Sequence, residues 1–319
     1  MGMKGRITFM TWNLYVGADL GPIYTAEFNE LPQRVTEVFR QFLATNFPER
    51  VKEIARQIAL NKPDIIGLQE AELWLLQVMP VPSLPIVKYN FIKLLLKELR
   101  KIGLHYEVAA TNDNAAASLL SSEGNSVSLL DRNTILVRKQ TGLHVIQSIS
   151  EEFQENLEVT IGGQLFLIVR GWSYIDVKAD GRVFRVINTH LEPLSEGGQI
   201  AQGNEILNGP AKTNLPVIVL GDLNSDADGT GTPTYGNFRS EGFEDVWEEA
   251  GQGAGFTCCQ DADLLNGLSL LNRRIDFILF NNGWMPIRAE LVGEDQSDRT
   301  PTALWPSDHA GMVGILFLP

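Results

Sequence analysis

The stretch LPVIVLGDLNSD, residues 215–226, runs from apolar, β-branched residues into a cluster of polar ones. The apolar half predicts a buried strand. Asp222 and Asn224 follow at its end, two residues apart, so both side chains can point the same way from an extended backbone. A strand fixes the backbone while the adjoining loop leaves the side chain free, which makes a strand end a natural place for reactive groups.

SDH at 307–309 has the reversed arrangement, because it comes just before the apolar run GMVGILFL at 311–318. Three more predicted strands carry a polar residue at one end: Asn13 closes ITFMTWN, Glu70 closes PDIIGLQE and His190 closes VFRVINTH. Five such ends in one chain predict a single site built at the edge of a sheet.

The composition is that of an ordinary globular protein of 319 residues, with 44% hydrophobic and 20% charged residues. No long Ser-, Gly- or Pro-rich tract divides the chain, so we expect one domain over residues 1–319. Within it, residues 73–128 are predicted to form an inserted region of loops and one helix, with a long polar surface loop at 111–128.

The formal net charge of −13 excludes a basic nucleic-acid footprint over the whole chain. It does not exclude a nucleic-acid substrate, because an enzyme can hold a polyanion with a metal ion and a local basic patch. An acidic chain also suits the recruitment of divalent cations.

The two cysteines, Cys258 and Cys259, are adjacent, which leaves no disulfide framework apart from a strained bridge between neighbours. We interpret them as two small buried hydrophobic residues. No apolar run reaches the roughly 18 residues needed to span a bilayer. The amino-terminal MGMKGRITFM has no signal-peptide core, so we expect a cytoplasmic protein, or a secreted one whose signal is missing from this sequence, and a monomer.

Apolar periodicity predicts helices near 31–45, 48–61, 89–102 and 198–208. Strands are predicted at 6–12, 65–69, 105–110, 133–139, 144–149, 157–161, 165–179, 183–190, 216–222, 274–280 and 311–318. The sequence KADGR at 178–182 is typical of a hairpin turn. Many strands, few helices and mixed connections indicate an α/β fold of two packed sheets with helices outside.

The candidate site residues also have plain structural interpretations. Glu70 is either a metal ligand or a solvated strand end, and Asn13 is of a type that commonly forms turns. His190 can be a histidine whose hydrogen bonds are satisfied at a strand end. Arg132 can reach a phosphate or pair with the adjacent Asp131.

His309 cannot readily pair with the adjacent Asp308, since neighbours on a strand point oppositely. A working histidine base therefore needs another carboxylate to fix its tautomer. Asp276, inside the apolar run RRIDFIL, is the candidate, unless it pairs with Arg273 or Arg274 instead.

Other chemistries find no support. The run DLNSDADG resembles the start of a calcium loop, but Tyr235 would occupy the position of the required Glu, so an EF-hand is excluded. The sequence has no GxSxG, no Walker A motif, no GxGxxG opening a helix and no HExxH. Hard oxygen donors together with imidazole suit Mg²⁺ or Mn²⁺ better than zinc or copper.

With these blocks in order, the chain resembles the endonuclease/exonuclease/phosphatase superfamily, which has the DNase I-like fold. The matching blocks are TWN with Asn13, LQE with Glu70, NTHL with His190, GDLNS with Asp222 and Asn224, RIDFIL with Asp276, and SDH with Asp308 and His309. The segments NLYVGADL, DRNTILVR and FTCCQDADLLN are similar to a bacterial branch whose substrates are mostly unassigned. The resemblance implies a four-layer α/β sandwich, two packed mixed sheets flanked by helices, with the site at one edge.

The resemblance also implies roles for the metal and the base. Glu70 would bind Mg²⁺ (Mn²⁺ is possible), helped by Asn13 and Asp308. His309, oriented by Asp276, would be the general base that activates water.

Four further residues take roles at the phosphate by the same resemblance. Asp222 and Asn224 would position the nucleophile and the phosphate. His190 would donate to a phosphoryl oxygen or to the leaving group. Arg132 falls where some members place an arginine that contacts phosphate.

The implied activity is metal-dependent hydrolysis of a phosphate ester by in-line attack of water. Nucleic acid, cleaved as by an endonuclease, is the first candidate substrate, with Arg132, Arg138 and Lys139 near the expected rim. Apurinic-site endonucleases carry an acid where this chain has Tyr15, which argues against abasic DNA. A histidine at position 190 is the pattern of DNase I-like and sphingomyelinase-like members.

A phospholipid is the alternative substrate, because LWLLQVMPVPSLPIV at 73–87 is apolar and Pro-rich and can form a membrane-docking loop. The plain interpretation is that Leu73, Trp74 and Leu76 pack onto the helix at 89–102. A small phosphorylated metabolite is a further alternative. An inert binding module would lack an acid or base, whereas every expected group is present here.

Overall fold

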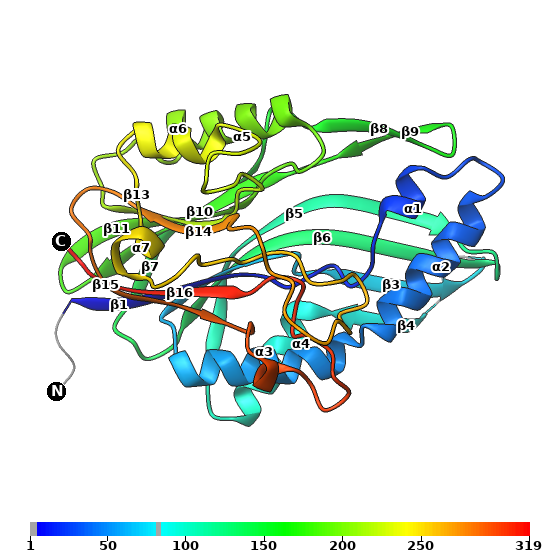
Figure 1. The fold of residues 1–319 in the computed structure, drawn as a ribbon, viewed down its shortest axis with the longest axis horizontal. Coiled ribbons are helices and arrows are strands. Elements are labelled where there is room, and N and C mark those ends of the chain that lie inside the picture. The colour runs from blue at the N-terminus through cyan, green and yellow to red at the C-terminus, as the bar shows by residue number, and fades with distance from the viewer. Residues whose placement is uncertain (1–4, 81–83) are drawn as a thin grey trace.

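The computed structural model describes residues 5–80 and 84–319 and confirms the predicted sandwich of two mixed sheets (Figure 1). The first sheet has eight strands, in the order β15 (Met285–Val292), β16 (Gly311–Phe317), β1 (Arg6–Asn13), β2 (Ile65–Gln69), β6 (Asn125–Arg138), β3 (Leu73–Val78) and β4 (Pro85–Asn90), with β5 (Tyr106–Leu120) paired to β6. The second has six, in the order β13 (Glu244–Asp245), β14 (Asp276–Phe280), β12 (Val217–Asp222), β11 (Arg182–His190), β10 (Gly171–Ala179) and β7 (His144–Glu152). A separate hairpin joins β8 (Leu157–Ile161) to β9 (Gln164–Ile168).

Helices cover both outer faces of the pair of sheets (Figure 1). The eight-stranded sheet is covered by α2 (Leu31–Ala44), α3 (Phe47–Asn61) and α4 (Phe91–Lys101), and the six-stranded sheet by α5 (Glu196–Asn208) and α6 (Thr234–Ser240). The short elements are α1 (Gly21–Tyr24), α7 (Val246–Ala250) and a 3₁₀ turn at Gln296–Asp298. Within the described ranges, no helix is both long and apolar enough to cross a bilayer.

Three apolar layers hold the four structural layers together. One fills the space between the sheets, and the other two lie under the helices on either side. In β12, Ile218 and Leu220 face the other sheet while Val219 faces the helices. A strand buried on both faces needs a continuous apolar run, which explains why LPVIVL has no polar alternation.

The helix predicted at 48–61 is confirmed as α3. Pro48 lies in its first turn, where a missing N–H costs nothing, and Lys62 ends it in the left-handed conformation with φ 47°. The predicted hairpin at 178–182 is also confirmed. Asp180 and Gly181 both have positive φ, as the tight turn between β10 and β11 requires.

The prediction of a long loop at 111–128 is wrong. Its small polar residues lie instead in β5 and β6, which pair as an antiparallel hairpin from Tyr106 to Leu120. The surrounding stretch 73–128, expected as an inserted region of loops and one helix, also supplies β3 and β4 to the sheet. Three residues of it, 81–83, lie outside the described residues. Composition favoured a loop here, but pairing with a neighbouring strand decided the backbone.

One buried side chain ties the two sheets together below the polar strand ends. Asn188 of β11 donates to the carbonyls of Leu68 and Thr134 in the other sheet and accepts from Gln69 Nε2 at 2.7 Å. Its place exists because Gly67 has no side chain: a Cβ there would lie 2.6 Å from Asn188 Oδ1. Asn188 and Gly67 therefore set the distance between the two sheets at this level.

We predict that Asn188→Ala lowers the free energy of unfolding by about 2–3 kcal/mol, because it removes three buried hydrogen bonds that join the two sheets. Chemical denaturation followed by circular dichroism measures this. Asn208→Ala, which removes an exposed amide near the end of α5, is the matched control and is expected to change stability by less than about 0.5 kcal/mol. Equal stability of the two variants would contradict the role given to Asn188.

Candidate active site

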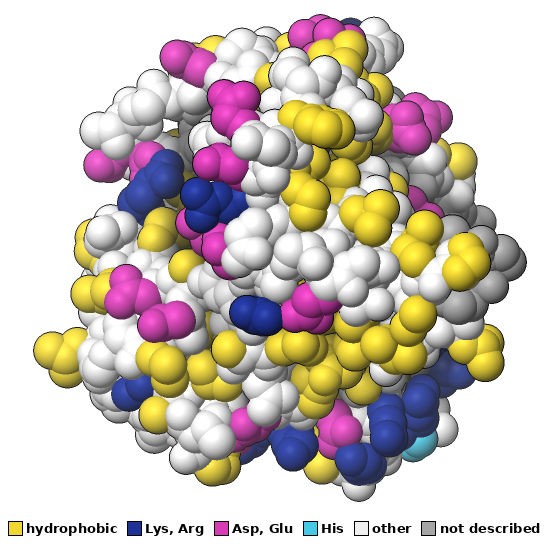
Figure 2. Space-filling model, turned by 90° about the vertical axis from the view of Figure 1, so that its right-hand side faces the viewer, with side chains coloured by type: hydrophobic (Ala, Val, Ile, Leu, Met, Phe, Trp, Pro, Cys, Tyr) yellow, Lys and Arg dark blue, Asp and Glu magenta, His cyan; other side chains and the backbone are white. Residues whose placement is uncertain are grey.

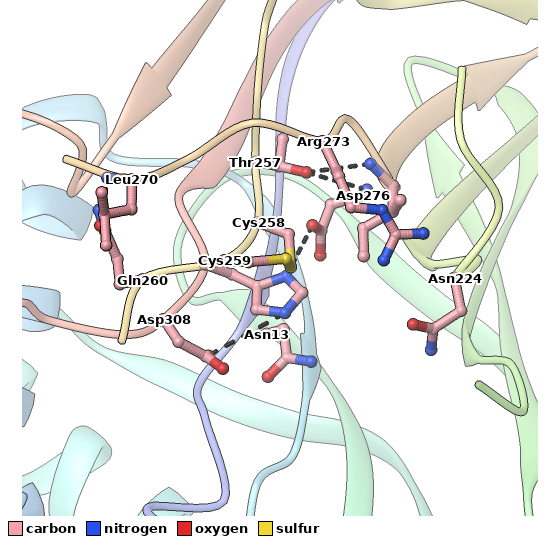
Figure 3. Close-up of a disulfide and its surroundings, with 12 residues drawn as sticks. Asn13, Asn224, Thr257, Cys258, Cys259, Gln260, Leu270, Arg273, Asp276 and Asp308 are labelled. Carbon is pink, nitrogen blue, oxygen red and sulfur yellow. Dashed lines mark hydrogen bonds and ion pairs between the residues drawn. A yellow bond between two sulfur atoms is a disulfide. The ribbon is translucent and has the colours of Figure 1, made fainter. Parts of the chain in front are cut away.

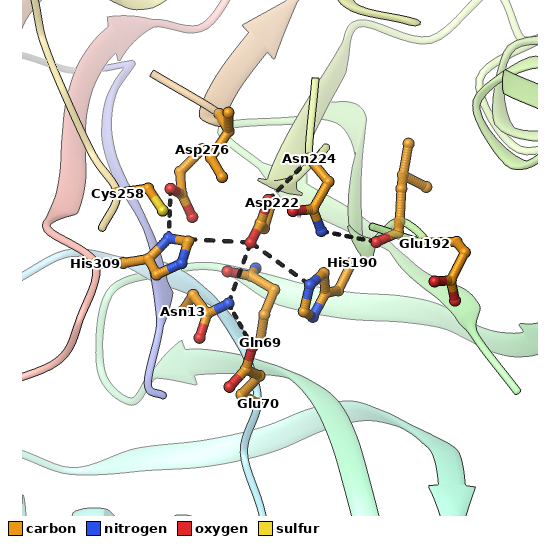
Figure 4. A network of polar contacts seen from close by, with 12 residues as sticks. Asn13, Gln69, Glu70, His190, Glu192, Asp222, Asn224, Cys258, Asp276 and His309 are labelled. Carbon is orange, nitrogen blue, oxygen red and sulfur yellow. Dashed lines mark hydrogen bonds and ion pairs between the residues drawn. The ribbon is translucent and has the colours of Figure 1, made fainter. Parts of the chain in front are cut away.

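The polar strand ends of both sheets meet at one edge of the sandwich (Figure 4). In the six-stranded sheet, His190, Asp222 and Asp276 are register partners across β11, β12 and β14. In the eight-stranded sheet, Asn13 ends β1 beside Gln69, the residue that precedes Glu70. β16 runs antiparallel to β1, so the residues just before it reach the same edge.

His309 is held by Asp276 rather than by its neighbour in sequence. Its Nδ1 lies 2.8 Å from Asp276 Oδ2, whereas Nε2 lies 4.0 Å from Asp308 Oδ1. This pairing confirms the predicted partner. The alternative is wrong, since Arg273 pairs with Asp226 and Arg274 with Asp245.

The hydrogen bond to Asp276 places the Nδ1 proton between the two groups and leaves Nε2 turned toward the open side of the site. Burial disfavours the charged imidazolium of His309, but Asp276 and Asp308 outweigh it and raise the pKa of His309 well above 6.5. His309 is thus a basic imidazole with a defined orientation.

His190 has the opposite character. A nitrogen of the buried Arg170 guanidinium lies 2.9 Å from its Nδ1 and must donate to it, so Nε2 carries the imidazole proton. Nε2 lies 3.5 Å from Asp222 Oδ2. Burial and the charge of Arg170 hold the pKa of His190 well below 6.5. His190 is a neutral hydrogen-bond donor that faces the site.

Asn13 bridges two carboxylates. Its Nδ2 donates to Glu70 Oε1 at 2.9 Å and to Asp222 Oδ2 at 3.1 Å, while its Oδ1 accepts from the backbone N–H of Tyr15. The carboxamide is therefore oriented as a donor between the sheets. Its predicted part in binding a metal stays a prediction.

Glu70 and Asn224 are both held in the left-handed backbone conformation, with φ of 50° and 51°. The carboxylate of Glu70 accepts from the N–H of Val16, and Asn224 donates its backbone N–H to Asp222 Oδ1 at 2.8 Å. The side-chain amide of Asn224 donates to the carbonyl of Leu191. Sharp turns after β2 and β12 thus fix the side chains that follow them.

The acids of the site differ in their access to solvent. Asp222 and Asp276 are at most 1% exposed, whereas the Asp308 side chain keeps 22% and Glu70 is partly buried. Burial and the charge of Asp276 raise the pKa of Asp222 to about 7. Burial raises the pKa of Asp308 to about 7 as well, where His309 opposes the shift and Glu70 adds to it.

Glu70 and Asp308 fit a divalent cation. Both offer hard carboxylate oxygens, and the charge of Glu70 acts on Asp308. Both side chains are partly exposed, which leaves room for solvent or substrate. Asp222, Asp276 and His309 also have ligand atoms within 4.8 Å of one another. That group is internally hydrogen-bonded through His309 Nδ1, and cation binding by Glu70 and Asp308 stays a prediction.

The two cysteines form a disulfide beside this site, so their interpretation as unpaired buried hydrophobes is wrong (Figure 3). The backbone of Cys258 bridges both Arg273 and His309. The preceding Thr257 accepts the N–H of Asp276 through its Oγ1 and, through its carbonyl, the N–H of Ala310. The segment 257–259 therefore lies between the backbones that carry Asp276 and His309 and sets the distance between those backbones.

Arg50 of α3 fixes the other side of the site. Its guanidinium is fully buried and donates to the backbone carbonyls of Leu14, Thr45 and Pro306, at 2.9, 2.9 and 2.7 Å. It thereby joins the loop after Asn13 to the segment that carries Asp308. Nothing in the sequence distinguishes Arg50 from the other arginines of amphipathic helices.

The structure does not bring Arg132 to the cluster. Its guanidinium donates to the carbonyls of Ala71 and Glu72 and to Asn90 Oδ1. Arg138 pairs with Asp64, which precedes β2, while Glu70 follows it, so Arg138 and the adjacent Lys139 lie at the opposite end of the sheet. The basic rim expected around the site is not formed by these residues.

Arg170 and three acids near it were missed from the sequence. Arg170 lies 3.4 Å from Asp131 Oδ2 and 3.8 Å from Glu192 Oε2. It lies between β9 and β10, inside the run 165–179 that was predicted as one strand. A charged residue in the apolar first half of that run was the signal that could have identified it. Glu72 and Glu192 each lie two residues after a predicted site residue, a spacing that places them on the same side.

We predict that Mg²⁺ or Mn²⁺ binds more weakly at pH 6 than at pH 8. Asp308, with a pKa of about 7 in the cation-free protein, is protonated below that value, so the cation must displace a proton there. For one displaced proton, the apparent Kd falls by about tenfold per pH unit up to pH 7 and then levels off. Calorimetric titration at several pH values measures this. Asp308→Asn is expected to bind weakly at every pH, and a pH-independent affinity of the unaltered protein would contradict the assignment.

Comparison with known proteins identifies the family of the chain. A model of the endonuclease/exonuclease/phosphatase family matches residues 10–309. No curated protein matches the chain.

Solved structures share the fold at low identity. A family protein from Bacteroides thetaiotaomicron is 17% identical, with a TM-score of 0.64 and 99% of each chain covered. A mannosyl-6-phosphatase of B. thetaiotaomicron is 18% identical, with a TM-score of 0.60, covering 98% of this chain and 100% of that one. TDP2 of D. rerio, complexed with a single-strand DNA product, is 16% identical, with a TM-score of 0.60 and coverage of 98% and 99%. The chain belongs to the endonuclease/exonuclease/phosphatase family, whose members are phosphoesterase hydrolases.

Proposed function

We propose that this protein hydrolyses phosphate esters with a divalent cation held by Glu70 and Asp308. The observation that carries the proposal is the pair of histidines on either side of Asp222, His309 held by Asp276 and His190 held by Arg170. A base and a hydrogen-bond donor on two sides of one buried acid suit attack of water on a phosphorus atom.

His309 acts as the general base. Nε2 takes the proton of the attacking water, while Asp276 holds Nδ1–H and stabilises the imidazolium that forms. A cation bound by Glu70 and Asp308 would stabilise charge on the phosphoryl oxygens and offset the acids that keep His309 protonated in its absence.

His190 donates from Nε2–H to a phosphoryl oxygen or to the leaving oxygen. Its low pKa keeps it neutral, so it supplies a hydrogen bond without a fixed charge to desolvate. Asp222 lies 3.5 Å from His190 Nε2 and 3.9 Å from His309 Nδ1, and its carboxylate orients the water between them. Asn224, through its N–H to Asp222, holds that carboxylate in place.

A nucleic-acid substrate, as for an endonuclease, has support from the D. rerio neighbour with its DNA product and opposition from the charge of this chain. Arg132, Arg138 and Lys139 all have other partners, which removes the local basic patch on which that candidate depended. A phospholipid or a small phosphate ester needs no such patch. An inert binding module is disfavoured, because no acid or base of the site is missing.

We predict that His309→Ala lowers kcat for bis-p-nitrophenyl phosphate by about 10²–10⁴-fold in the presence of Mg²⁺ or Mn²⁺. Release of p-nitrophenolate measures the rate. His144→Ala, which removes an exposed imidazole on β7, is the control and is expected to keep full activity. EDTA is expected to abolish turnover in the unaltered protein. An unchanged rate in His309→Ala would refute the role of the base, and incubation with plasmid DNA and with sphingomyelin liposomes compares the two macromolecular candidates.

A further inference from the structure

A cavity opens beside the candidate active site, between α1, α2, the β5–β6 hairpin and the β8–β9 hairpin. Its volume, counted out to its open mouth, is about 990 Å³, and we call it the slot. Most of its wall is apolar, with residues that include Leu20, Ile23, Val35, Ala117, Leu129 and Phe166.

The slot borders the candidate active site. Glu70, the proposed cation ligand, forms part of its wall, and so does Arg170, whose guanidinium holds His190. A ligand that places its phosphate at Glu70 and His309 can thus extend directly into the apolar part. The slot is continuous with the proposed site and is a part of its substrate path.

Two buried acids stand where the polar end of the slot meets the apolar part. Glu72 is 1% exposed, and among the described residues no donor reaches either of its carboxylate oxygens. Asp131, beside it, also has one oxygen without a partner. Burial and the charge of Asp131 raise the pKa of Glu72 well above 4.5, so Glu72 is neutral and its hydroxyl is the donor available to Asp131. Glu72 therefore adds no charge to the slot.

Exposed apolar side chains surround the mouth of the slot. Leu165 and Leu167 of β9 are 67% and 52% exposed, and Phe28 of the α1–α2 loop is 71% exposed. The hairpin and this loop touch, since Gly162 N–H donates to the carbonyl of Ala26. Figure 2 looks onto this end of the molecule and shows apolar side chains gathered across it, without a single dominant charge. Apolar residues that are exposed together, and not singly, are typical of a surface that contacts an apolar partner.

We propose that the slot holds the apolar chain of a phosphate ester, drawn from a lipid surface that the exposed end of the molecule contacts. This inference rests on the proposed function, because the phosphate of the same molecule lies at Glu70 and His309. The apolar wall suits an alkyl or acyl chain. The net charge of −13 favours a zwitterionic surface over an anionic one.

The test is a series of alkyl p-nitrophenyl phosphates from methyl to dodecyl, each below the concentration at which it forms micelles. Water attacks phosphorus, p-nitrophenolate leaves, and the alkyl phosphate remains. If the slot holds the chain, kcat/KM rises by about fourfold per added methylene until the slot is full. A flat series together with turnover of bis-p-nitrophenyl phosphate would overturn the slot assignment and leave the proposed function intact.

Two variants locate the effect. Ala117→Phe fills the slot and is expected to lower the dodecyl-to-methyl ratio of kcat/KM at least tenfold. Ser118→Phe puts the same ring on the exposed face of β5, one residue away, and is expected to keep the ratio of the unaltered protein. Equal ratios in the two variants would contradict the proposal.

Binding without turnover separates this inference from the proposed function. Dodecyl phosphate is expected to bind the unaltered protein more tightly than methyl phosphate in calorimetry, and Ala117→Phe to lose that preference. If no phosphate ester is hydrolysed with any cation, the proposed function fails while this measurement still decides the slot. Equal affinity for the two phosphates would reject the slot.

Contact with a lipid surface is tested by sedimentation with phosphatidylcholine vesicles. The unaltered protein is expected to sediment with the vesicles, and Leu165→Glu to remain in the supernatant. Ile146→Glu, at an exposed apolar position of β7 away from the slot, is the matched control and is expected to sediment. An unaltered protein that stays in the supernatant, or a Leu165→Glu variant that sediments fully, would overturn the lipid surface as the source of the chain.

Discussion

The hydrogen bonds of Asn188 across the two sheets are the constraint on which the site depends. Asn13, Glu70 and His309 come from one sheet, and His190, Asp222 and Asp276 from the other. Their distances are therefore set by how the sheets are stacked. Asn188 reaches Leu68 and Gln69 at the level just below these residues, and in a dry interior such directed bonds permit one alignment where apolar packing alone would tolerate several.

The same stacking gives two histidines different chemistry. His309 lies among carboxylates, which stabilise its charged form, while His190 lies against a guanidinium, which opposes it. The two rings are separated by one acid, Asp222. Environment, and not residue type, thus separates the pKa values of the two imidazoles, as enzymes do that hold like groups in unlike surroundings.

Much of this arrangement could be predicted from the sequence, because strand ends in a packed sandwich have few places to go. Apolar runs located most strands, and polar residues at their ends located Glu70, His190, Asp222 and His309. The pairing of His309 with Asp276 followed from the rule that neighbours on a strand point apart.

Other features depended on contacts that a linear pattern does not contain. The polar, small residues of β5 are typical of a loop, and only pairing with β6 makes them a strand. Arg132 and Arg170 both lie in or next to predicted strands, yet one binds backbone carbonyls and the other holds His190. The cavity has no signal of its own, since its walls come from five separate segments.

The apolar walls of the slot and the floor of the candidate site, which His190, Asp222 and Asp276 form at the strand ends, belong to different parts of the architecture. The floor is anchored by strands from the middle of both sheets, whereas the walls are a hairpin, a short helix and the far ends of two long strands, all outside the interior between the sheets. Substitutions in the apolar part of the walls, away from Glu70 and Arg170, can thus accumulate without disturbing the two histidines. Proteins built on this scaffold can therefore change their substrate while the reaction stays the same.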